Sequence, residues 1–142
     1  MINYKNVEIA SLIERFELKK LPKHEWTHEA HLVVAIWYCT KYEFYEALLL
    51  ARDNISRHNE SVGTENTDTG GYHETITKFW LIIANKFLIG RDHFSFESNC
   101  NALINSNFGV SSHPFDYYSP KLLFSVKARH NWINPDLKEL KL

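Results

Sequence analysis

The run Leu32 to Cys39 reads Leu-Val-Val-Ala-Ile-Trp-Tyr-Cys and follows directly on the polar stretch His24 to His31. A helix that is apolar on nearly all sides must be buried in a protein core. Thr27 is a suitable N-cap for such a helix, because its hydroxyl can accept a hydrogen bond from an N–H group of the first turn. We therefore predict a central helix that begins at His28, with the rest of the chain packed around it.

Other segments carry apolar residues at the spacing of amphipathic helices, i, i+3, i+4 and i+7. The predicted helices cover residues 7–18, 28–39, 42–57, 72–88, 96–104 and 121–129. Ser119-Pro120 is a helix start with Pro at the first position, and Ser125 is a candidate break in that last helix. No hairpin dipeptide joins alternating runs, which argues against strands. We predict one all-α domain, 1–142, built as a single-domain helical bundle of four main helices with a C-terminal helical elaboration.

The charge balance argues against a nucleic-acid partner. The chain has 16 Lys and Arg residues against 17 Asp and Glu residues, a net charge of −1, and so no basic footprint for DNA or RNA. No apolar run reaches the ~18 residues of a membrane span, and the first residues lack the pattern of a signal peptide. Cys39 and Cys100 have no Cys-x-x-Cys spacing and are expected to be buried free thiols. These features predict a cytoplasmic protein without a membrane partner.

Three histidines stand at predicted helix starts. His28 and His31 are three residues apart and so share one face of the central helix, and His73 opens the helix over 72–88. If both helices begin at the same end of the bundle, the three imidazoles can meet. Three protein ligands with one open position suit a catalytic divalent metal, here Zn, Fe or Mn. Glu29 and Glu74 are then the candidate catalytic bases beside His28, His31 and His73.

A polar loop is predicted over His58 to Gly71, a stretch almost without apolar residues. Loops of this length in compact domains are usually functional or disordered. Its amides and hydroxyls, with the tyrosine that follows, are candidate substrate-binding groups: Asn59, Asn66, Thr67 and Tyr72. Four arginines are candidates for an anionic group, namely Arg52, Arg57, Arg91 and Arg129, while Trp26, Trp37 and Trp80 are expected in the core or in pocket walls.

Several words of the sequence occur together in one known group of proteins. Trp26-Thr27-His28-Glu29-Ala30-His31-Leu32, Gly71-Tyr72-His73-Glu74-Thr75 and Tyr118-Ser119-Pro120 stand in the same order as similar words in a group of small bacterial proteins of uncharacterised function. The chain resembles that group over most of its length. The resemblance implies a shared fold and a bacterial origin, and it brings no activity, cofactor or substrate.

The sequence leaves three functions open. The first is a metal-dependent enzyme, a hydrolase or an oxygenase, that acts on a small polar molecule through the His and Glu site. The second is a metal-free small-molecule-binding module that uses the same residues between aromatic walls. The third is a structural or protein-interaction bundle with no small-molecule site.

Overall fold

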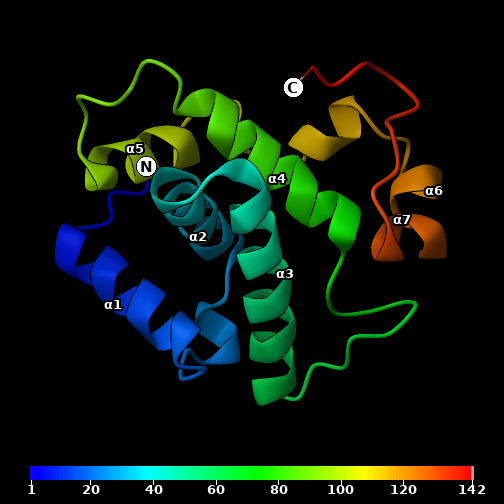
Figure 1. Ribbon diagram of the computed structural model, residues 1–142, viewed down its shortest axis with the longest axis horizontal. Coiled ribbons are helices and arrows are strands. Elements are labelled where there is room, and N and C mark those ends of the chain that lie inside the picture. Colours follow the sequence, from blue (N-terminus) through cyan, green and yellow to red (C-terminus); the bar gives the residue numbers. More distant parts are fainter. Residues whose placement is uncertain (142) are drawn as a thin grey trace.

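The computed structural model describes residues 1–141 and is built from helices joined by turns and loops (Figure 1). The helices are α1 (Asn6–Glu17), α2 (His28–Lys41), α3 (Phe44–Ser61), α4 (Glu74–Phe87), α5 (Phe96–Ile104), α6 (Pro120–Leu123) and α7 (Val126–His130), with 3-10 turns η1 (Lys23–Glu25) and η2 (His113–Asp116). The described part contains no strand, which confirms the all-α prediction. None of its helices is long and apolar enough to cross a membrane.

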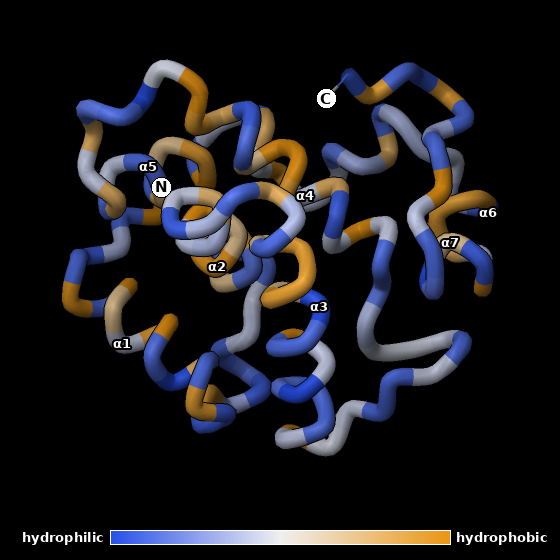
Figure 2. The backbone as a smooth tube through the Cα atoms, viewed as in Figure 1, coloured by the Kyte–Doolittle hydropathy of each residue, from blue (hydrophilic) through white to orange (hydrophobic). Residues whose placement is uncertain are grey.

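Helix α2 is the centre of the bundle and contacts α1, α3, α4 and α5. Its side chains from Leu32 to Ile36 are all buried, and burial of each large aliphatic side chain stabilises the fold by roughly 1.5–3 kcal/mol. Thr27 Oγ1 accepts a hydrogen bond from Ala30 N at 3.2 Å, so the helix begins where the cap predicts. Figure 2 shows the hydrophobic colour along the packed helices, whereas the connection between α3 and α4 is largely polar.

Helix α3 is longer than its sequence predicts. The helix continues to Ser61, so the expectation of a loop from His58 onward is wrong for its first residues. The polar side chains His58 and Asn59 face inward: the His58 ring is fully buried near Phe16 and donates from Nε2 to Leu21 O at 3.0 Å. These two polar residues are therefore buried, and the tertiary structure gives a partner to His58 Nε2 and to Asn59, although His58 Nδ1 has none among residues 1–141.

The connection over 62–73 swings out below α7 and returns to the start of α4 (Figure 1). Asn66 holds it in place: its Nδ2 donates to Ser56 O at 3.0 Å, and its Oδ1 accepts from Asn59 Nδ2 at 3.0 Å and from Tyr72 N at 2.9 Å. Gly71 has φ +78°, and a Cβ atom there would lie 2.5 Å from Glu65 O. Only glycine fits this return without a shift of the backbone.

The C-terminal helices pack on α4. Helix α6 ends at Leu123, and Ser125 caps the start of α7 by accepting from Ala128 N at 3.1 Å, which confirms the predicted break. Helix α7 contacts α4, and Thr75 Oγ1 donates to Asn131 O at 2.7 Å. This packing places Arg129 and Phe124 beside the first turn of α4.

Candidate functional site

A cavity of about 450 Å³ opens where α2, α3, α4 and the 62–73 connection meet, with the C-terminal helices at its edge. This size falls in the ordinary range of small-molecule sites. Its lining combines aromatic, aliphatic and polar side chains: Lys23, Trp26, His31, Ile55, Asn59, Val62, Thr64, Gly71, Tyr72, His73, Ile76, Thr77, Phe124 and Arg129. Four residues predicted for the site, from three segments of the sequence, therefore line one cavity, namely His31, Asn59, Tyr72 and His73.

His31 lines the cavity, and one of its ring nitrogens has no hydrogen-bond partner among residues 1–141. Its Nδ1–H donates to Thr27 O at 2.7 Å, and this carbonyl partner fixes the tautomer, so Nε2 carries a lone pair. The ring lies 3.8 Å from the Trp26 ring, centroid to centroid. Burial lowers the pKa of His31 to about 4, and His28 and His58 add to the decrease, against the hydrogen bond to Thr27. His31 is therefore a neutral hydrogen-bond acceptor at neutral pH.

His73 is held by both of its ring nitrogens. As the N-cap of α4 it accepts from Ile76 N at Nδ1, at 3.1 Å, and its Nε2–H donates to Leu123 O at 2.7 Å. Burial lowers the pKa of His73, and the Arg129 guanidinium contributes to the decrease. The ring is a fixed wall of the cavity, with no free nitrogen to offer a ligand.

His28 lies elsewhere. Its Nε2–H donates to Gly109 O at 2.7 Å, and its ring meets the Trp80 ring edge-on with centroids 5.0 Å apart. Across residues 1–141, no group of three or more His, Cys, Asp or Glu side chains is placed to hold a metal ion. The predicted metal centre of His28, His31 and His73 finds no support in this arrangement, because His28 points to Gly109 O and both ring nitrogens of His73 have backbone partners.

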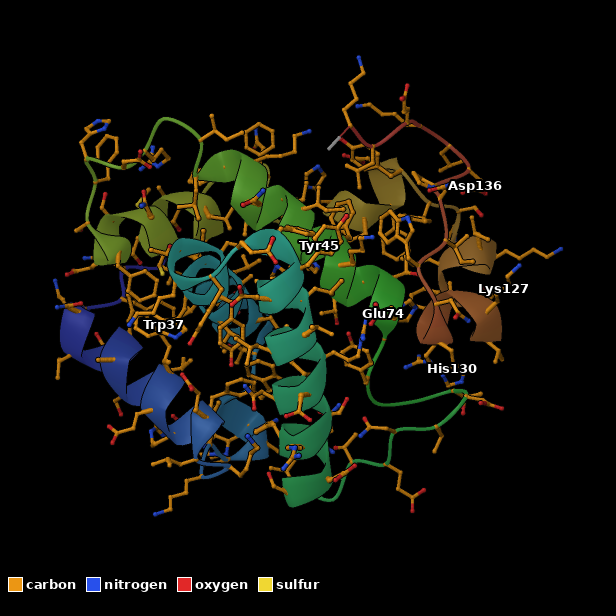
Figure 3. The ribbon with its side chains drawn as sticks, in the orientation of Figure 1. Trp37, Tyr45, Glu74, Lys127, His130 and Asp136 are labelled. Carbon is orange, nitrogen blue, oxygen red and sulfur yellow. The ribbon has the colours of Figure 1, made fainter. Side chains whose placement is uncertain are left out.

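The two predicted catalytic carboxylates, Glu74 and Glu29, do not line the cavity. Glu74, at the start of α4 (Figure 3), accepts from Arg52 Nε at 3.0 Å, from Arg52 Nη2 at 2.7 Å and from Tyr72 Oη at 2.7 Å. Burial raises the pKa of Glu74, but the bonds from Arg52 and Tyr72 outweigh it and the net pKa is lowered. A carboxylate held in this way is a weak base and serves to fix the Tyr72 phenol. Glu29 lies in the first turn of α2, outside the cavity lining.

The predicted substrate-binding residues divide into two groups. Asn59 and Tyr72 line the cavity, whereas Asn66 lies behind them and fixes both. Thr67 is exposed and its Oγ1 accepts from Thr69 N and Gly70 N, so it serves its own turn. Asn66 and Thr67 shape the connection and do not line the cavity.

Two basic residues complete the lining. Arg129, one of four arginines singled out in the sequence, is partly buried, and its Nη1 donates to Gly71 O at 3.0 Å and to Tyr72 O at 3.3 Å. Lys23 lies on η1 and carries no sequence signal that distinguishes it from other surface lysines. Trp26, expected as core or pocket wall, forms a wall. Only the folded chain brings Lys23 and Arg129 to one cavity.

No family model, curated protein or solved structure matches the chain. The resemblance to small bacterial proteins and the bacterial origin it implies stay predictions.

Proposed function

We propose that the protein is a binding module that takes a small polar molecule into this cavity without a metal ion. The observation that carries the proposal is neutral His31, which lines a cavity of about 450 Å³ beside Trp26 and whose Nε2 has no hydrogen-bond partner among residues 1–141. A partly buried acceptor without a partner favours a ligand that donates a hydrogen bond.

The polar lining is held in place before any ligand arrives. Tyr72 is fixed by Glu74, Asn59 by Asn66, and His73 by Leu123 O and Ile76 N. Side chains that need no reordering lower the entropic cost of binding. This preorganisation supports a binding role over a purely structural one.

A metal-dependent hydrolase or oxygenase ranks second. It would require His28 and His73 to give up hydrogen bonds of 2.7 Å to Gly109 O and Leu123 O before they could bind Zn, Fe or Mn. It would also require Glu74 to leave Arg52 in order to act as a base. The metal-free module requires neither change.

The test is capture of small molecules. Tag-free protein is incubated with a small-molecule extract of its expression host, washed, denatured and analysed by mass spectrometry, alongside His31→Phe, Asn59→Leu and the control Thr67→Ala. The parent protein and the Thr67 variant are expected to retain the same compound, and the two cavity variants to lose it. Equal retention by all four proteins would refute the proposal. A stoichiometric metal in the parent protein that is lost in the His31 variant would favour the metal-dependent enzyme.

A further inference from the structure

We infer that the ligand is a small anion whose carboxylate or phosphate group binds between Arg129 and Lys23. The inference rests on the proposed function and names the class of molecule that the cavity takes. Among its lining residues are two cations and no carboxylate. A cavity lined with charge of one sign attracts ligands of the other sign.

Arg129 differs from every other arginine in the chain. The others each bind a side-chain oxygen: Arg15 binds Glu25, Arg52 binds Glu74, Arg57 binds Asp53 and Arg91 binds Asn99. Arg129 binds only the carbonyls of Gly71 and Tyr72, through Nη1, and its Nε and Nη2 have no acceptor among residues 1–141. Its anchored guanidinium thus has donors left for a carboxylate or phosphate, which such a group binds through paired hydrogen bonds.

Two acidic residues beside the lining, Glu74 and Asp68, already have partners. Glu74 is held by Arg52, and Asp68 lies 2.7 Å from Nε2 of His130, which is labelled in Figure 3. Neither carboxylate contacts Arg129. The first turn of α4 also borders the cavity through Ile76 and Thr77, and the amino end of a helix carries partial positive charge. The charged side chains in the lining are therefore those of Arg129 and Lys23, and this helix end lies beside them.

The other lining residues indicate which chemical groups the rest of the ligand carries. Trp26, Ile76 and Phe124 give an apolar surface, and His31 Nε2 needs a donor. A planar or apolar body with an anionic group at one end fits this surface. A hydroxyl or amine on the body would bind His31.

The experiment follows the signals of the cavity by two-dimensional NMR during titration with four probes: benzoate, phenyl phosphate, neutral benzamide and cationic benzylamine. Saturable shifts are expected for the Trp26 indole N–H and the Arg129 Nε–H with benzoate, phenyl phosphate or both. Tighter binding of benzoate would identify the anionic group as a carboxylate, and tighter binding of phenyl phosphate would identify it as a phosphate. Benzamide is expected to bind about tenfold more weakly or worse, because it lacks the charge for Arg129.

Three variants test the residues. Arg129→Gln is expected to weaken binding of the preferred anion by about tenfold or more, while Arg57→Gln, on an exposed arginine that does not line the cavity, leaves the affinity unchanged. Arg129→Gln also loses bonds to the 62–73 connection, so Lys23→Glu provides a second variant on an exposed residue, and it is expected to weaken the same anion.

Equal affinity for benzoate and benzamide, with no effect of Arg129→Gln and Lys23→Glu, would overturn the anion inference and leave the binding cavity in place. Absence of a saturable shift with either anion would also overturn it. The capture experiment then decides separately whether the cavity takes an uncharged molecule, so failure of the anion inference and failure of the binding module are distinguishable.

Discussion

Replacement of Glu74 by Gln is expected to destabilise the protein, although the side chain keeps its size. Gln cannot accept from Arg52 Nε, Arg52 Nη2 and Tyr72 Oη at once, because one of its two terminal atoms is a donor. At least one of the three bonds becomes a contact between two donors, and the attraction between the two charges is lost.

The size of the effect follows from the exposure of the two partners. The Glu74 side chain is 10% exposed, whereas that of Arg52 is 46% exposed. Loss of hydrogen bonds to a buried charge costs about 1.5–3 kcal/mol each, but Arg52 can regain water, so its charge is not left buried. We expect a loss of about 2 kcal/mol in the free energy of unfolding at pH 7, which lowers Tm by about 4–8 °C for a chain of this size.

The pH dependence gives a second check. The pKa of Glu74 is lowered in the folded protein, so its stabilising effect is present above the pKa of the unfolded chain and is lost as the pH falls through the folded pKa. Urea unfolding of the parent and of Glu74→Gln at several pH values should show a constant gap above about pH 5.5 and a shrinking gap below about pH 4.

The matched control is Asp53→Asn, which breaks an exposed ion pair with Arg57. The Arg57 side chain is 65% exposed and that of Asp53 is 58% exposed. It should cost at most about 0.5 kcal/mol. A Glu74→Gln protein as stable as the parent, or a gap that stays constant down to pH 3, would refute the role assigned to the Arg52, Glu74 and Tyr72 contacts.

Three further changes test other parts of the structure. Gly71→Ala should destabilise the protein by about 2 kcal/mol or more in urea unfolding, because the added Cβ would lie 2.5 Å from Glu65 O. Gly63→Ala is the control: its φ is similar and nothing lies within 4 Å of the added Cβ, so it should cost only about 1–2 kcal/mol. Equal losses in the two variants would contradict the clash at Gly71. His31→Phe should flatten the pH dependence of stability between about pH 6.5 and 4. In that range His31 of the unfolded parent binds a proton, whereas folded His31, with a pKa of about 4, does not, so the parent loses about 1 kcal/mol of stability per pH unit. An unchanged slope in the variant would contradict the neutral state of folded His31. Asn101→Ala should release the N-terminal segment, because the Asn101 side-chain amide accepts from Tyr4 N at 2.8 Å and donates to Tyr4 O at 2.9 Å. Amide hydrogen exchange at residues 2–5 should become faster, while the global free energy of unfolding changes by only about 1 kcal/mol. Unaltered exchange would show that other contacts hold the segment.

The sequence alone predicted the features that depend on neighbouring residues. The apolar run from Leu32 predicted a central helix, Thr27 predicted its start, and Ser125 predicted the break between the last two helices, and the structure confirms each. Periodicity and capping act within a few residues, so they can be recognised in a chain without knowledge of its fold. The prediction of a loop from His58 onward was wrong because local patterns carry no information on distant partners: the His58 ring bonds to Leu21 O, which lies far away in the sequence.

The tertiary structure decided which of the candidate residues meet. His28 and His31 share the first turn of α2, yet the packing of that helix directs His28 to Gly109 and leaves His31 at the cavity. The rotation of a helix about its axis is set by all the surfaces that pack on it, and no local pattern records it. Lys23 and Arg129 come from opposite parts of the chain and share the cavity only because α7 docks on α4. The sequence thus contained the residues of the candidate site, and the packing of the helices selected those that can serve one ligand.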